Sequence, residues 1–133
     1  MKPKTIYISG RMTGLSDFNF PAFFRAEERL QARGYKTINP ARNQVQNTWH
    51  DYLRLDIKNM MSADAIYLLN GWEASKGSRI EFWLASQLDF EILYEQPAAI
   101  ARALEEMITD TVPMAPVAAI PQAIKRVEET NER

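Results

Sequence analysis

Short apolar runs alternate along the chain with segments in which apolar residues recur every three or four positions. The short runs are rich in β-branched and aromatic residues, and they predict strands at residues 5–9, 35–38, 65–69 and 90–94. The periodic segments predict helices between Asn19, as a helix-capping residue, and Gly34, over residues 49–61, and from about residue 78 to residue 88. The expected buried positions are Trp49, Leu53, Ile57 and Met60 in the second helix and Ile80, Leu84 and Leu88 in the third.

This alternation of strands and helices predicts the fold class. A β-α-β-α-β-α-β order favours a parallel sheet with helices on both faces. We therefore expect an α/β fold, a flavodoxin-like or Rossmann-like doubly wound parallel sheet of four to five strands, with a strand order such as 2-1-3-4.

The chain of 133 residues has the size of one domain, which is expected to occupy residues 1–96. Residues 97–133 are expected to form a C-terminal extension. It would contain a helix over 97–109, an extended linker with three prolines over 112–121, and a charged tail.

Composition excludes several classes of function. The net charge of -1 gives no electrostatic footprint for a nucleic acid polymer or a membrane surface. The chain has no cysteine and one histidine, so disulfides, thiolate metal sites and histidine-rich metal centres are excluded, and no metal or organic cofactor is expected. No apolar run approaches the ~20 residues that span a bilayer. We expect a soluble, cytoplasmic protein.

The chemistry is expected in residues 70–85. A Ser/Gly-rich turn there follows the third strand and opens the third helix. Ligands of open α/β sheets bind outside the carboxyl ends of the strands, and the free N–H groups of a helix start favour anions. The glycine-containing loop after the first strand, residues 10–14, and the polar stretch 41–48 are expected at the same edge.

Two carboxylates, Asp56 and Glu81, stand near the apolar edges of the helices that flank the third strand. Paired carboxylates suit glycosidic-bond chemistry, in which one of them can attack the anomeric carbon. Glu81 is expected in the first turn of its helix, where the helix dipole would lower its pKa and keep it ionised as a nucleophile.

Simpler interpretations of the same residues remain open. The sequence Ser78-x-x-Glu81 matches a capping box, in which the glutamate only bonds a backbone N–H. Asp56 fits a solvated helix position, the Ser75–Arg79 segment fits a turn with good capping residues, and Asp64 fits a turn former. Aromatic residues at helical spacing are most often part of a core.

Three motifs in order resemble the nucleoside 2-deoxyribosyltransferase superfamily. They are Tyr7-Ile-Ser-Gly-Arg-Met-Thr-Gly14, Asp56 with Ala63-Asp64 eight residues later, and Ser75-x-Gly77-x-x-x-Glu81-Phe-Trp-Leu-Ala85. The chain resembles in particular a branch of small deoxyribosyltransferase-like proteins, and its spacing is similar to that of the 2′-deoxynucleoside 5′-phosphate N-hydrolases. The resemblance covers about residues 5 to 95.

The resemblance implies a role for each matched position. Glu81 would be the nucleophile that forms a covalent deoxyribosyl intermediate, and Asp56 would contact the sugar and assist departure of the base. The substrate-binding residues would be Tyr7, Gly10, Arg11, Asp64, Ser75, Gly77, Ser78 and Arg79. A homodimer or larger homo-oligomer, whose neighbouring subunit closes the pocket, is implied as well.

The resemblance also shows departures from the family pattern. The transferases usually have an acidic residue and Gly-Thr before the glutamate, whereas this chain has Lys76-Gly-Ser-Arg79. Two aromatic residues, Phe82 and Trp83, follow Glu81. Lys76, Arg79 and Arg11 could converge on a phosphate, which favours a nucleotide substrate. We therefore expect cleavage of the N-glycosidic bond of a 2′-deoxynucleoside 5′-monophosphate. The alternatives are deoxyribosyl transfer between bases, a nucleotide-binding protein without turnover, and a small scaffold whose C-terminal extension docks a partner.

Overall fold

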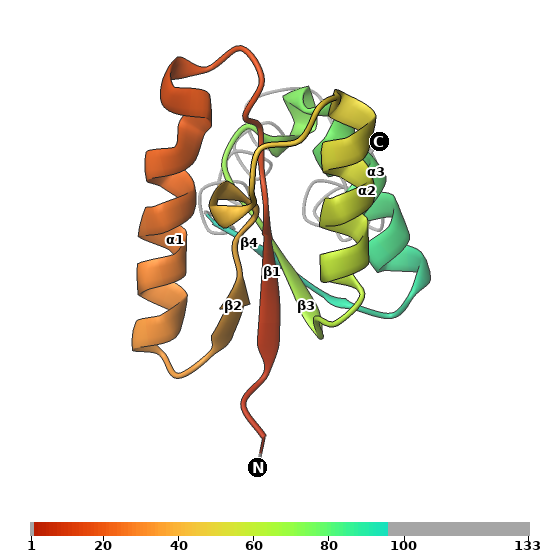
Figure 1. Ribbon diagram of the computed structural model, residues 1–133. Helices are drawn as coiled ribbons and strands as arrows, with labels where there is room; N and C mark the ends of the chain where they lie inside the picture. Colours follow the sequence, from red (N-terminus) through yellow and green to blue (C-terminus); the bar gives the residue numbers. More distant parts are fainter. Residues whose placement is uncertain (1, 96–133) are drawn as a thin grey trace, which may run out of the picture.

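A single parallel sheet of four strands forms the centre of the molecule (Figure 1). The structure is a computed structural model that describes residues 2–95. The strand order is β2-β1-β3-β4, and all three neighbouring pairs are parallel, which confirms the predicted fold class and order. The strands are β1 (Thr5–Ser9), β2 (Lys36–Ile38), β3 (Ala65–Leu68) and β4 (Glu91–Tyr94).

Three helices cover the two faces of this sheet (Figure 1). Helix α1 (Phe20–Ala32) lies on one face, and α2 (Trp49–Met60) and α3 (Lys76–Gln87) lie on the other. Short 3-10 turns, η1 (Ser16–Asn19), η2 (Pro40–Arg42) and η3 (Trp72–Ala74), lie in the connections. This division between the faces follows from right-handed crossovers, because the chain moves from β1 to β2 in one direction and from β2 to β3 in the other.

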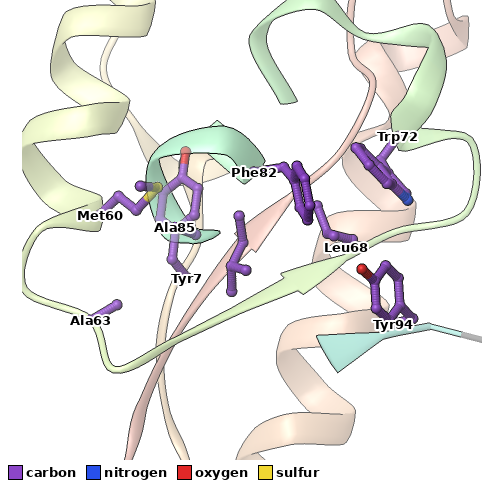
Figure 2. Close-up of a cluster of buried hydrophobic side chains, with 9 residues drawn as sticks. Tyr7, Met60, Ala63, Leu68, Trp72, Phe82, Ala85 and Tyr94 are labelled. Carbon is purple, nitrogen blue, oxygen red and sulfur yellow. The ribbon is translucent and has the colours of Figure 1, made fainter. Parts of the chain in front are cut away.

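The alternation of side chains along the strands builds two hydrophobic clusters. Ile6 and Ile8 of β1 point toward α1 and pack with Phe23 and Leu30. Tyr7 points to the opposite face, in the cluster that also contains Met60, Phe82 and Ala85 (Figure 2). The first strand is therefore buried on both sides, as expected of a central parallel strand.

Helix α3 is rotated relative to its predicted register. It begins at Lys76, and the Ser75 hydroxyl accepts a hydrogen bond from the Ser78 amide as its N-cap. Its buried residues are Ser78, Glu81, Phe82 and Ala85, whereas Leu88 is 50% exposed. The predicted stripe is confirmed only at its edge, because Ile80 and Leu84 are half-buried, Leu84 packs against the cluster around Tyr7, and the prediction for Leu88 is wrong. The most buried face carries two polar residues that a search for apolar spacing passes over.

Two further local predictions differ from the structure. Asn19 is the N-cap residue of α1, as predicted, but its side chain makes no capping bond, because its backbone is left-handed with φ of 61° and its side-chain amide donates to the Arg11 carbonyl at 2.9 Å. Trp49 is 37% exposed, because it lies at the start of α2, beyond the part of the helix that covers the sheet.

The predicted C-terminal helix, linker and tail lie outside the described residues. Within residues 2–95, every helix is too short or too polar to cross a lipid bilayer.

Candidate functional site

A cavity of about 540 Å³ opens at the carboxyl ends of the strands, between the loop after β1 and the starts of α2 and α3. This is the edge at which open α/β sheets bind ligands. Side chains from β1, the loop after η2, α2 and α3 meet there. The polar or small residues in its wall are Tyr7, Ser9, Gly10, Thr13, Asn43, Asn47, Thr48, Asp56, Ser75, Gly77, Ser78 and Glu81.

Glu81 is held by two hydroxyl groups that come from the central strand. The Tyr7 phenol donates to Glu81 Oε2 at 3.0 Å, and Ser9 Oγ donates to Glu81 Oε1 at 2.7 Å. Glu81 is only 4% exposed, yet it lines the cavity. A buried carboxyl whose two oxygens both accept hydrogen bonds has a fixed orientation.

Ser78 extends this group of hydroxyls. Its Oγ lies 2.9 Å from Ser9 Oγ, and both serines are almost completely buried. The side chains of Tyr7 and Ser9 point from β1 toward the face of the sheet that α3 covers, and both residues line the cavity. β1 therefore places two hydroxyl groups against the first two turns of α3.

Asp56 is the second carboxyl in the cavity wall. It comes from the middle of α2, and its Oδ1 accepts a hydrogen bond from the side-chain amide of Asn43 at 2.7 Å. Asn43 directly follows η2, in the polar stretch that was predicted to lie over the strand ends. Oδ2 of Asp56 is left available for a proton or a ligand.

Burial raises the pKa of both carboxyl groups. The pKa of Glu81 rises to about 8, first because burial disfavours its charge and second because of the negative charge on Asp56. Burial likewise raises the pKa of Asp56 to about 7, although the Asn43 amide opposes this rise. Burial and the neighbouring Glu81 hold the pKa of Tyr7 well above its ordinary range, so its phenol stays a donor.

These contacts overturn two interpretations of Glu81. The predicted lowering of its pKa by the helix dipole is wrong, because Glu81 is the sixth residue of α3, beyond the first turn where the dipole acts, and it is buried. The capping box is wrong as well, because Ser75 is the N-cap and both Glu81 oxygens accept from side-chain hydroxyls.

Aromatic and apolar side chains form the outer wall of the cavity. Phe18, Phe20, Trp49 and Tyr52 belong to it, and Phe18 is 61% exposed. Gly77 lies below Trp49 at the start of α3, where a Cβ would come within 3.8 Å of the indole. The cavity thus combines flat apolar surfaces at its mouth with a buried polar floor, the arrangement usual for small-molecule sites.

Three of the predicted binding residues do not line this cavity. Asp64 lies at the opposite, amino edge of the sheet, where its Oδ2 accepts from the Thr5 amide at 2.9 Å. Arg79 donates to the Glu73 carbonyl at 2.7 Å, and Arg11 turns back to the Thr13 carbonyl at 3.3 Å.

Lys76 does not join them in a phosphate site, because its ammonium lies over the Trp49 ring, 5.1 Å from the centroid. Among the described residues, the cavity wall contains no lysine or arginine. The predicted convergence of three cations is therefore not found, because each of them already has a partner within its own loop or on the neighbouring helix.

Comparison with models of known families gives a match for the chain. The family model that matches it is described as "Domain of unknown function (DUF4406)", and the match spans residues 4–94. The chain belongs to the DUF4406 family. No curated protein matches it. The DUF4406 domain includes all four strands and every residue of the cavity wall.

Two residues of the DUF4406 site were missed at the level of sequence. Ser9 is the last residue of the predicted first strand, and its two-residue spacing from Tyr7, which places both side chains on one face of β1, is the signal that could have identified it. Asn43 lies in a polar stretch without periodicity, and no pattern distinguishes it from its neighbours. Within residues 2–95, no three His, Cys, Asp or Glu side chains come together in a group that could hold a metal ion.

Proposed function

We propose that this protein cleaves the N-glycosidic bond of 2′-deoxynucleoside 5′-monophosphates, with Glu81 as the nucleophile. The observation that carries the proposal is the pair of buried carboxyl groups in one cavity, one held at both oxygens and the other with an oxygen available. The resemblance to the nucleoside 2-deoxyribosyltransferase superfamily assigns the same two residues to attack and to assistance of the leaving base.

One distribution of the proton between the pair is reactive. The two pKa values, about 8 for Glu81 and about 7 for Asp56, are close enough that the carboxyl groups titrate together and hold a single proton near pH 7.5. By these pKa values the shared proton lies mainly on Glu81. The reactive form is the one in which the proton is on Asp56 Oδ2, because attack requires an ionised Glu81 that accepts from both Tyr7 and Ser9.

The reaction would proceed in two balanced steps. A Glu81 oxygen forms a bond to C1′ as the bond from C1′ to the base nitrogen breaks, and the base takes the proton of Asp56. Water then attacks C1′, the Asp56 carboxylate takes its proton, and the glutamyl ester bond breaks. The products are the free base and 2-deoxyribose 5-phosphate. Absence of a 2′-hydroxyl eases formation of the oxocarbenium-like transition state, so deoxy substrates are expected to react faster.

The shape of the cavity supports a nucleoside-sized ligand. Its volume of about 540 Å³ lies within the ~300–1,000 Å³ usual for small-molecule sites. The aromatic residues at its mouth offer faces on which a base can stack, while the sugar would lie toward the carboxyl groups. The Ser75 hydroxyl and the Gly77 backbone amide are donors at the start of α3 that a phosphate could use.

A second candidate is base exchange between uncharged deoxynucleosides through the same ester. It is favoured by the lack of lysine and arginine in the cavity wall among the described residues, since a phosphate is usually met by such cations. In this case a second base, and not water, attacks C1′.

The test is chromatographic detection of free base. The purified protein is incubated with the four deoxynucleoside monophosphates, the four deoxynucleosides and the matching ribonucleotides, with and without a second free base. We expect base release from the monophosphates, and its loss by at least about 10³-fold in Glu81→Gln. Asp64→Asn is the matched control, because Asp64 is a carboxylate outside the cavity and its substitution should leave release unchanged.

The outcomes separate the candidates. A new nucleoside formed with the added base identifies a transferase, and free sugar phosphate alone identifies a hydrolase. Full activity in Glu81→Gln refutes the assignment of the nucleophile. Tight nucleotide binding without any product identifies a binding protein and refutes catalysis.

A further inference from the structure

A chain of two serine hydroxyls ends on Glu81, and none of the expected site roles accounts for it. Ser9 Oγ lies 2.7 Å from Glu81 Oε1 and 2.9 Å from Ser78 Oγ. Ser9 is 1% exposed and Ser78 is 2% exposed, so bulk water does not compete for these bonds.

The number of protons fixes the direction of this chain. Ser9 has one O–H group, and an ionised Glu81 can only accept, so the Ser9 proton points to Oε1. The remaining bond between the serines must then use the Ser78 proton, which Ser9 Oγ accepts. Ser78 is itself fixed, because its amide donates to the Ser75 hydroxyl at 3.1 Å in the N-cap of α3.

We propose that Ser9, oriented by Ser78, is the positioning residue of Glu81, and that it makes Oε1 the anchored oxygen and Oε2 the attacking oxygen. This inference rests on the proposed function. Ser9 comes from β1 whereas Glu81 and Ser78 come from α3, so the hydroxyl chain fixes the carboxylate relative to the sheet.

The choice between the two oxygens follows from their donors. Oε1 has the shorter bond, 2.7 Å to Ser9, and that donor is strengthened by the bond it accepts from Ser78. Oε2 has the longer bond, 3.0 Å to the Tyr7 phenol. When Oε2 attacks C1′, it gives up its charge, while Oε1 becomes the ester carbonyl and still accepts from Ser9.

A matched pair of substitutions separates the hydroxyl from its packing. Ser9→Thr and Ser9→Val add the same bulk to a buried position and differ only in the hydroxyl group. Ser78→Ala removes the donor that orients Ser9. Ser86→Ala is the control within α3, because the Ser86 hydroxyl bonds the Trp83 carbonyl on the exposed side of the helix.

Two measurements are made on each variant. The first is kcat and KM for base release from the best monophosphate. The second is the titration midpoint of the Glu81 carboxyl carbon, followed by NMR with ¹³C-labelled glutamate and assigned by comparison with Glu81→Gln. This midpoint reports the hydrogen bonds of the carboxylate without requiring turnover.

We expect Ser9→Val to have a kcat about 10- to 100-fold below that of Ser9→Thr, with a similar KM, because a hydrogen bond to a charged group is lost. The midpoint of Glu81 should move to higher pH in Ser9→Val, and by less in Ser78→Ala. Ser86→Ala should match the wild type in both measurements.

Equal kcat values and equal midpoints in Ser9→Thr and Ser9→Val, together with an active wild type, overturn the positioning role and leave the proposed function standing. A wild type that releases no base refutes the proposed function, and the role of Ser9 falls with it. The two failures are distinguished by the activity of the unsubstituted protein.

Discussion

Replacing Glu81 with glutamine should make the protein more stable at alkaline pH while removing its proposed nucleophile. Glutamine has the size of glutamate, and its amide can still bond the Tyr7 and Ser9 hydroxyls. It differs in having no charge to bury. The buried carboxyl group of Glu81 therefore lowers the free energy of unfolding, and it does so more strongly as the group ionises.

The magnitude follows from the pKa. The pKa of Glu81 rises from its ordinary value of 4.5 to about 8 on folding, so the folded chain holds its proton more tightly than the unfolded chain. Stability from this group is present below pH 4.5 and is lost as the pH rises through 8. At ~1.4 kcal/mol per pH unit, the loss between pH 5 and pH 9 is at most ~4 kcal/mol. Part of the rise in pKa comes from Asp56, so we expect ~2 to 4 kcal/mol.

The assay is urea unfolding of the wild type and of Glu81→Gln at several values between pH 5 and pH 9. Tryptophan fluorescence is a suitable signal, because Trp72 is 2% exposed and packs on Phe82. The free energy of unfolding of Glu81→Gln should exceed that of the wild type by an amount that grows with pH. Glu28→Gln, at an exposed position of α1, should follow the wild type. A constant difference between wild type and Glu81→Gln across this range would refute the reasoning about the buried carboxyl.

The pH dependence of kcat/KM for base release should be bell-shaped with its maximum between pH 7 and 8, because the pair must hold one proton, and a profile that is flat from pH 6 to 9 contradicts the proton assignment. Gly10→Ala should lower the free energy of unfolding by ~1 to 3 kcal/mol in urea titrations, because a Cβ there would come within 2.8 Å of the buried Leu69 side chain. Gly77→Ala is its control, since the nearest atom to that Cβ lies at an ordinary 3.8 Å, and equal stability of the two variants would contradict the packing argument.

The stability that the two carboxyl groups remove is compensated by the packing of the strand next to them. Two carboxyl groups with raised pKa values lie on one face of β1, and Ile6 and Ile8 are fully buried on its other face. The stability lost at the site is offset by burial of β1 on both faces. A rigid central strand also holds Tyr7 and Ser9 in the fixed positions that a preorganised site requires.

The sequence by itself determined the fold to the level of strand order. The alternation of strand-like and helix-like segments favoured a parallel sheet. The apolar runs of β1 and β3 agree with this, because these two central strands are mostly buried. The edge that carries the site followed too, because parallel strands all end at the same side. Chain order predicted that edge for Gly10, Asp56, Ser75, Gly77, Ser78 and Glu81, whereas Tyr7 was predicted from the resemblance, and all seven line the cavity.

Only the tertiary structure decided which of the polar residues meet. Asp64 and Arg79 lie within the motifs in sequence, yet Asp64 is at the far edge of the sheet and Arg79 bonds the backbone of η3. The tertiary structure also determines the pKa of Glu81, since burial raises this pKa although the helix start was expected to lower it. Sequence periodicity reports which face of an element is apolar, whereas a pKa and a hydrogen bond depend on groups that are distant along the chain. Ser9 and Ser78 are 69 residues apart, and only folding brings their hydroxyls together so that Ser9 also reaches the Glu81 carboxylate.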